Sequence, residues 1–263
     1  MIRVFLAEWR KLRRPTLFLG TLGVVFALSV LITSLLFLLL DSHGGNGPRG
    51  RVITRETLAL PSGLYLGFTN FASLLGTIAL SVFAAQTALE YTNGTLRNLL
   101  VRQPQRLVLL AGKYVAMCSF ALLTVLVSAV GSIGISIALA PSKKVDTSAW
   151  FTHDSFQLLY SNLGNVYLSA IAYGTVGMAV GIMLRSPISS ISISLAWILI
   201  LEGILSFTVN GLDKWLPGQL MSLISQRNNL NVSYTYALVG SGIYLALFGL
   251  IATTLFTRRD VSN

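Results

Sequence analysis

The chain has 263 residues, of which 54% are hydrophobic and 11% charged, with a mean hydropathy of +0.72 and a net charge of +10. Soluble domains carry about a quarter charged residues, so this composition excludes an ordinary soluble domain and indicates a membrane protein. The single cysteine, Cys118, excludes an internal disulfide.

The chain opens with the basic segment MIRVFLAEWRKLRR, which contains a helical pattern of apolar residues. The apolar residues at this spacing are Ile2, Phe5, Leu6, Trp9 and Leu12. Basic residues, including Arg10 and Arg13, occupy the other faces. We expect an interfacial amphipathic helix over residues 1–15, with Trp9 at headgroup depth. The pattern fits a plain topology anchor as well as a docking element.

Six apolar runs follow, each long enough for the roughly 20 residues that cross a bilayer as a helix. They cover residues 17–40, 64–89, 114–140, 156–184, 186–209 and 234–257. Helices are expected because lipid cannot satisfy exposed backbone groups. The fold class predicted is therefore an all-α integral membrane protein with six transmembrane helices.

An even number of spans places both termini on one side of the membrane. That side also receives the connector 89–113 and Arg185, and with the termini it holds most of the 19 lysines and arginines. The positive-inside bias then predicts cytoplasmic termini. We interpret the basic surplus as a topology signal and an attraction to anionic headgroups, with no nucleic-acid partner.

The connector ALEYTNGTLRNLLVRQPQRLVLLAGK carries turn and cap signals for a short helix. The dipeptide Asn93-Gly94 is expected to end the preceding span, with Gly94 in a left-handed conformation. Thr95 is expected to cap a new helix over residues 95–103, and Pro104 to end the segment.

Leucines and polar residues segregate on this short helix. Leu96, Leu99 and Leu100 fall on one face, and Arg97, Asn98 and Arg102 fall elsewhere. Glu90 is favourably placed near the helix N-terminus and could pair with Arg97. Arg106 and Lys113 are expected to flank the next span at headgroup level.

The connector resembles the first cytoplasmic loop of ABC-2 type transporter permeases, whose pattern is ExxxGTLRxLLxxxPxR…K. The matching residues are Glu90, Gly94, Thr95, Leu96, Arg97, Leu99, Leu100, Pro104, Arg106 and Lys113. The ending FTRRDV, residues 256–261, is similar to that family's C-terminal edge. Any cytoplasmic loop collects Arg and Lys, which explains the charge of the connector but not its Glu, Gly-Thr, leucine face and Pro.

The resemblance implies a single permease domain over residues 1–263 in a bacterial plasma membrane. Its short helix would be a coupling helix resting on a separate ATP-binding subunit, two of which serve each complex, beside a second permease copy or paralogue. The coupling residues implied are those of the motif together with Arg102. The cargo expected is hydrophobic or amphiphilic, such as a peptide antibiotic, drug or lipid-like molecule, and export is the expected direction.

The sequence offers no motor or catalytic motif of its own. G-x-x-x-x-G-K-[ST] is absent, because Gly112-Lys113 is followed by Tyr114. We therefore expect a transport subunit rather than an enzyme, without a cofactor or metal site, and with ATP and Mg on the partner. His43 and His153 fall in predicted outer loops and no H-E-x-x-H occurs, which disfavours an intramembrane protease.

Polar residues inside the spans are the candidates for a substrate pathway. Glu202 is the only acidic residue within a predicted span, and Asn162, Asn165 and Tyr167 belong to the most polar one. Each has a plainer interpretation as a hydrogen-bonding tie between segments. The rival function is a secondary carrier or channel that uses Glu202 as an ion or proton site.

Two further patterns concern packing. Gly174, Gly177 and Gly181 have the spacing of a close helix contact. Residues 212–231 suggest an outer amphipathic or re-entrant helix broken at Pro217-Gly218, and residues 41–63 and 141–155 suggest polar outer loops.

Overall fold

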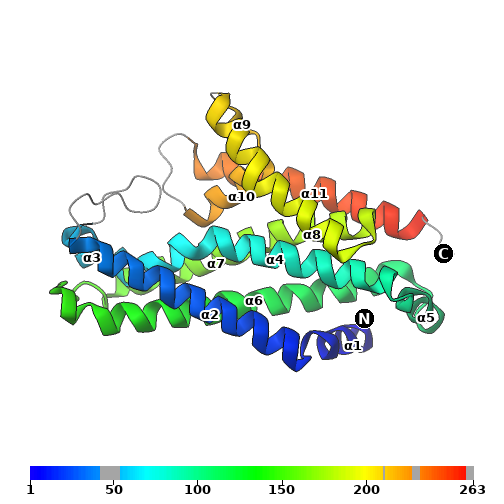
Figure 1. Ribbon diagram of the computed structural model, residues 1–263, viewed down its shortest axis with the longest axis horizontal. Helices are drawn as coiled ribbons and strands as arrows, with labels where there is room; N and C mark the ends of the chain where they lie inside the picture. Colours follow the sequence, from blue (N-terminus) through cyan, green and yellow to red (C-terminus); the bar gives the residue numbers. More distant parts are fainter. Residues whose placement is uncertain (42–53, 210, 227–231, 259–263) are drawn as a thin grey trace. The chain divides into compact units, whose positions relative to one another are not determined.

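The computed structural model describes residues 1–41, 54–209, 211–226 and 232–258, and all regular structure in these ranges is helical (Figure 1). The α-helices are α1 Ile2–Leu12, α2 Pro15–Leu38, α3 Arg55–Ala59, α4 Leu66–Thr92, α5 Thr95–Arg102, α6 Arg106–Leu139, α7 His153–Leu184, α8 Pro187–Leu195, α9 Glu202–Thr208, α10 Pro217–Gln226 and α11 Tyr234–Arg258. A π-helical segment, Ala196–Leu201, joins α8 to α9.

Six helical segments of the described chain are long and apolar enough to cross a membrane, which indicates a multi-pass membrane protein. They are Pro15–Leu38, Pro61–Thr92, Arg106–Leu139, His153–Leu184, Pro187–Thr208 and Tyr234–Arg258. The six predicted spans are therefore confirmed. The third begins earlier than expected, so Arg106 and Lys113 lie within α6 instead of flanking it.

The helices contribute to two compact units, and α4, α6 and α7 each supply residues to both. The unit formed by residues 15–75 and 122–167 contains α2 and α3. A hydrogen bond of 2.9 Å between the hydroxyls of Thr33 and Ser132 ties α2 to α6 inside it. Here a buried Trp150 donates from Nε1 to the carbonyl of Leu58 in α3 at 2.8 Å. The predicted loop over residues 141–155 thus contains a buried tryptophan, and α3 lies within residues 41–63, where only a loop was expected.

The second unit, residues 1–14, 76–121 and 168–263, contains α1, α5 and α8 to α11. Its α4 and α7 pack closely through the predicted glycine positions. A Cβ on Gly177 would lie 2.2 Å from the carbonyl oxygen of Leu80, and one on Gly181 would lie 2.8 Å from that of Ala84. The predicted close helix contact is thus confirmed, because these glycines allow backbone to approach backbone.

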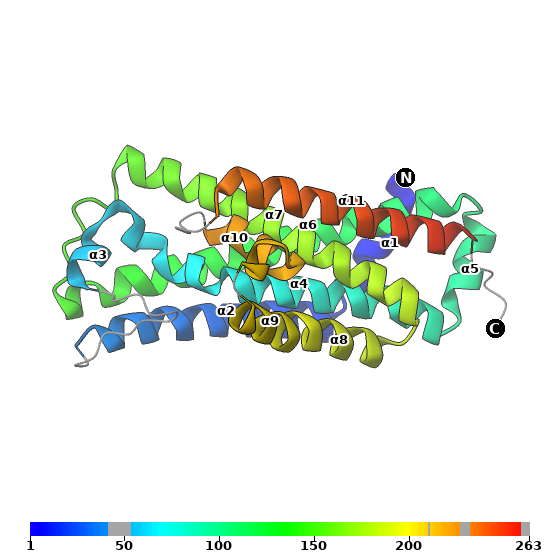
Figure 2. The same cartoon turned by 90° about the horizontal axis from the view of Figure 1, so that it is seen from above.

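Helix α10 packs against α7 and α11 in this unit (Figure 2). The tyrosine hydroxyl of Tyr173 donates to the carbonyl of Gly218 at 2.6 Å, and Ser169 donates to that of Met221 at 2.7 Å. The expected break near Pro217 is present: a 3-10 turn, Leu212–Lys214, ends before it, and Pro217 is the first residue of α10, where a missing N–H costs nothing. Residues 227–231 of the predicted segment lie outside the described residues.

Candidate functional site

The short helix α5 is set off from α4 by a left-handed glycine. Gly94 has φ +64° and occupies the N-cap position of α5, as expected of a residue without a Cβ. Thr95 is the first helical residue, and its hydroxyl points back to the carbonyl of Glu90 at 3.5 Å. The expected capping by Thr95 was therefore wrong by one position.

Helix α5 buries one apolar side chain and exposes another. Leu96 is buried, Leu99 and Leu100 are half-buried, and Arg97 is exposed. Val101 is 80% exposed, the highest value among the large apolar residues of α5. The surface that α5 offers to solvent thus combines an apolar side chain with a cation. Pro104 lies in the short link to α6 and is exposed.

Four buried or half-buried charges form a cluster behind α5, which we call the charge quartet: Glu8, Lys11, Glu90 and Lys113. The Lys11 ammonium lies 2.5 Å from Glu8 and 2.6 Å from Glu90. The Lys113 ammonium lies 2.8 Å from Glu8 and 2.6 Å from Glu90. Each charge therefore has two opposite neighbours, and the quartet joins α1, α4 and α6. Glu90 pairs with these lysines instead of the Arg97 considered from the sequence.

The quartet favours the charged forms of Glu8 and Lys11. Burial alone would raise the pKa of Glu8, but the Lys113 and Lys11 ammonium groups outweigh it and lower this pKa below its ordinary value of 4.5. Burial alone would lower the pKa of Lys11, but Glu90 and Glu8 outweigh it and raise this pKa above 10.5. The buried Lys113 of α6 contacts the carboxylates of both Glu8 and Glu90.

Helix α1 presents different faces to the protein and to its surroundings. Glu8 and Lys11 face the protein with Val4, whose side chain would lie 2.6 Å from a Cβ on Gly112 of α6. Of the predicted apolar stripe, Leu12 is buried, Phe5 and Trp9 are half-buried and stacked with ring centroids 6.1 Å apart, and Ile2 is 76% exposed. The two cations expected on the polar faces are exposed: Arg10 and Arg13. The protein-facing side of α1 therefore combines the charged Glu8 and Lys11 with the apolar Val4 and Leu12.

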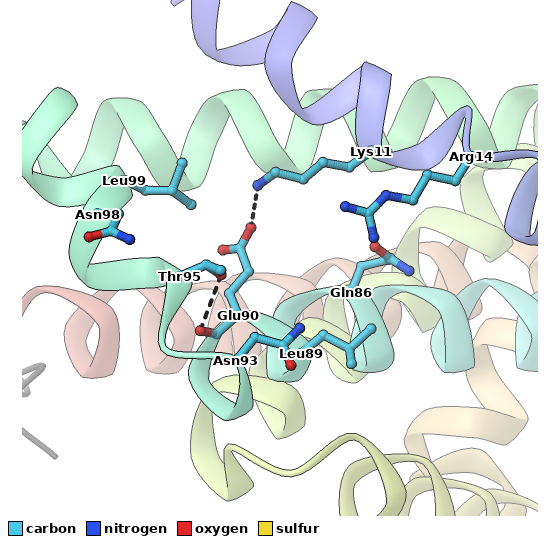
Figure 3. A pocket seen from close by; sticks show the side chains of 9 residues that line it. All are labelled: Lys11, Arg14, Gln86, Leu89, Glu90, Asn93, Thr95, Asn98 and Leu99. Carbon is cyan, nitrogen blue, oxygen red and sulfur yellow. Dashed lines mark hydrogen bonds and ion pairs between the residues drawn. The ribbon is translucent and has the colours of Figure 1, made fainter.

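A cavity of about 350 Å³ lies between α1, α4 and α5 (Figure 3). Lys11 and Arg14 line it from α1 and the residues that follow, Gln86 and Glu90 from α4, and Asn98 from α5. Figure 3 shows the Lys11 ammonium directed at the Glu90 carboxylate across this space. Leu89 and Leu99 also line it, so polar and apolar side chains together face this space. No group of metal-ligating side chains occurs among the described residues.

Arg106 makes contacts that its expected coupling role does not require. Its Nη1 donates to the carbonyls of Phe256 at 3.3 Å and Thr257 at 3.1 Å. Both carbonyls belong to the last turn of α11, where the helix itself supplies no N–H donor for them. A cation is favoured at this end of a helix. Of the FTRRDV ending, residues 259–261 lie outside the described residues, as does the side chain of Arg102.

Glu202 is fully buried and both of its carboxylate oxygens accept hydrogen bonds. Oε1 accepts from the backbone N–H of Gly218 and from Trp197 Nε1, each at 3.0 Å. Oε2 accepts from the backbone N–H of Gln219 at 3.0 Å. The carboxylate therefore satisfies free N–H groups in the first turn of α10. This geometry corresponds to the tie between segments that the sequence left open.

The other pathway candidates belong to the other unit. Asn162 and Asn165 are buried and Tyr167 is half-buried, all in the part of α7 that packs with α2 and α6 residues. The Asn162 amide donates to the carbonyl of Leu158, one turn earlier in the same helix, at 2.8 Å. That bond satisfies the amide within α7.

Sequence reasoning missed Glu8, the residue that fixes α1. The available signal was a lone carboxylate three residues before Lys11 in an otherwise cationic segment, off the apolar stripe. Its partner Lys113 is 105 residues away, a separation that helical periodicity does not address.

Two comparisons with known proteins bear on this chain. A family model described as a protein of unknown function (DUF2705) matches residues 59–262. An uncharacterized protein of Bacillus subtilis (strain 168), YhcI, is 24% identical over 212 residues, which cover 74% of this chain and 67% of that protein. The family match includes Glu90 and Lys113 of the charge quartet, and Glu8 and Lys11 precede it.

Proposed function

The chain belongs to the DUF2705 family of proteins of unknown function, and we propose that it is the transmembrane permease subunit of an ATP-driven ABC transporter. In this proposal α5 is a coupling helix that docks on a separate ATP-binding subunit. The resemblance of the connector to ABC-2 type permeases supports this assignment, and so does the form of α5 itself.

The observation that carries the proposal is the exposed surface of α5. Val101 and Arg97 face solvent on a helix whose other side is seated through Leu96. Apolar and arginine side chains are the types enriched where proteins dock. A helix of eight residues between two spans is short enough to enter a groove of a partner subunit.

The connections of α5 suit the transfer of a mechanical displacement. It starts three residues after α4 ends and stops four residues before α6 begins. The charge quartet also links α1 to α4 and α6, close to the ends of these helices that lead to α5. A push on α5 would therefore move α1, α4 and α6 together, as expected of an element that reorients packed helices.

The rest of the assembly follows from this role. ATP and Mg²⁺ would bind two partner ATPase subunits, whose closure would drive a pair formed by this chain and a second permease copy or paralogue. The membrane would be a bacterial plasma membrane with both termini cytoplasmic, and α1 would lie at its inner interface. The poorly charged spans favour export of a hydrophobic or amphiphilic cargo.

The alternative, a secondary carrier with an ion or proton site at Glu202, is less well supported. Its two carboxylate oxygens are occupied by three N–H donors of the protein. That arrangement favours an anchoring role for Glu202.

The proposal is tested by purifying the tagged chain from its native membrane and assaying its companions. We expect a P-loop ATPase to co-purify, and we expect Arg97→Glu combined with Val101→Asp to abolish ATPase stimulation by cargo while membrane insertion stays intact. Gln105→Glu, an exposed change just beyond α5, is the matched control and should leave stimulation unchanged. Full stimulation in the double variant would exclude coupling through α5.

A further inference from the structure

The cavity of about 350 Å³ between α1, α4 and α5, which we call the α5 cavity, lies at the end of a membrane-spanning segment. Gln86 and Glu90, which line it, belong to the last two turns of the span Pro61–Thr92, and the lining residue Asn93 follows directly. The volume is at the lower end of the range for pockets that bind small ligands. The α5 cavity therefore lies at the depth where a span meets the aqueous phase.

Cationic groups outnumber carboxylates around the α5 cavity. Lys11 and Arg14 line it together with one carboxylate, that of Glu90. Oε1 of Glu90 lies 2.6 Å from the ammonium groups of both Lys11 and Lys113, so its charge is already compensated. Arg14, in contrast, is exposed, and its guanidinium forms no ion pair with any residue that the structure describes. The lining therefore carries a surplus positive charge, which favours an anion.

Several N–H donors of the α5 cavity are available to a ligand. Asn93 and Asn98 line it, and their amide groups make no hydrogen bond within the described part of the chain. Lys11 has three N–H groups and gives two of them to carboxylates, which leaves one for a ligand. Figure 3 shows Arg14 and Gln86 to one side of the Lys11 ammonium and Asn98 to the other. The donors thus approach the space from different directions.

We propose that the α5 cavity binds the phosphate group of an anionic ligand, with Arg14 as the principal cation. A guanidinium pairs with two phosphate oxygens at once, and a tetrahedral phosphate presents further oxygens to donors on other sides. A carboxylate has only two oxygens, both of which Arg14 alone can engage, so the additional donors of Asn93 and Asn98 favour phosphate. Such a group reaches the end of a span as the headgroup of an anionic phospholipid or as a soluble anion. The site does not depend on the ATP-binding partner proposed above.

The test is thermal unfolding of the full chain in detergent, because a ligand that binds the folded state raises the unfolding midpoint. The ligands are inorganic phosphate, dihexanoyl phosphatidylglycerol and dihexanoyl phosphatidylcholine, with sodium chloride at equal ionic strength as the reference. We expect a phosphate ligand with a net negative charge to raise the midpoint more than phosphatidylcholine, which has none. A rise with phosphatidylglycerol alone assigns the site to lipid headgroups, and a rise with inorganic phosphate alone assigns it to a soluble anion. A rise with both shows that the phosphate group itself is recognised.

Two matched pairs of variants locate the binding. Arg14→Gln should weaken binding of the active phosphate ligand about tenfold or more, because it removes the unpaired cation. Arg13→Gln is its control, since Arg13 is exposed, adjacent and outside the lining, and should bind as the wild type does. Asn98→Asp should weaken binding to a similar extent by placing a carboxylate in the cavity. Gln105→Glu makes the same change of charge at an exposed position outside the cavity and should leave binding unchanged.

Three results would overturn the proposal. The first is a midpoint that no phosphate ligand raises beyond chloride, and the second is an equal rise with the two lipids and none with inorganic phosphate. The third is equal binding by Arg14→Gln and Arg13→Gln. Loss of a co-purified protein partner in Arg14→Gln, without any effect of phosphate on the midpoint, would also overturn it and would assign the α5 cavity to an acidic side chain of that partner.

Discussion

In the part of the chain that the structure describes, acidic side chains are buried in two places, and their hydrogen-bonding partners differ. In the charge quartet, Glu8 and Glu90 are matched by two ammonium groups. At the other site, Glu202 is matched by two backbone N–H groups of α10 and one indole N–H. The first arrangement balances full charges from three helices, so removing one member leaves another unpaired. The second is a carboxylate at a helix N-terminus, where an uncharged hydrogen-bond acceptor can partly replace the carboxylate.

The largest effect is expected from removing one cation of the quartet. Lys113→Met leaves two buried carboxylates with Lys11 alone and should lower the free energy of unfolding by about 3–5 kcal/mol, the cost of breaking a buried ion pair. Thermal unfolding in detergent measures it, and limited proteolysis should show early release of α1. Arg10→Met, an exposed change on α1, is the control. Equal stability of the two variants would mean that the quartet does not hold α1.

The α10 anchor should be the more tolerant of a neutral replacement. Glu202→Ala leaves one buried and two part-buried N–H donors without an acceptor and should cost about 2–3 kcal/mol, whereas Glu202→Gln keeps one acceptor oxygen and should lose less. Hydrogen exchange of the α10 amides reports the difference directly. Indistinguishable exchange in Glu202→Ala and the wild type would refute the anchoring role.

A pH titration should test the contribution of Glu8 and Lys11 to the charge quartet. Because the pKa of Glu8 is lowered in the folded chain, its contribution to stability is complete above pH 4.5 and declines as the pH falls through the lowered value. Because the pKa of Lys11 is raised, its contribution is complete below pH 10.5 and declines as the pH rises further. Proteolytic release of α1 should therefore be minimal between these limits and increase outside them. The Glu8→Gln variant should lose the acid-side increase that Glu8 causes.

The smallest effect concerns the fit of α10 to its anchor. A Cβ on Gly218 would lie 2.7 Å from Oε2 of Glu202, so Gly218→Ala should cost about 1 kcal/mol by overpacking. The cost should shrink when Glu202→Ala removes the carboxylate, and a double-mutant cycle measures that coupling. Additive costs in the cycle would argue against direct contact.

The sequence predicted the spans because length and hydropathy determine which segments can cross a bilayer. It also predicted the left-handed Gly94 and the close contact at Gly177, because both depend on the absence of a side chain. The cap expected at Thr95 lies one position earlier, at Gly94, because neighbouring residues of a turn can serve the same role. The quartet could not be predicted from periodicity, since it joins residues such as Glu8 and Lys113 from distant parts of the chain.

The role of α5 is tested most directly by cross-linking from its exposed surface in the native membrane. A photoreactive amino acid at position 101 should yield a covalent product with a P-loop ATPase, because Val101 is 80% exposed on α5. The same probe at Val130, which is 68% exposed on the membrane-spanning part of α6, should not. A product of the predicted kind only at position 101 is the result that the proposal requires. Reaction at position 101 with lipid or water alone, while the ATPase is present and active in the same membrane, would contradict it.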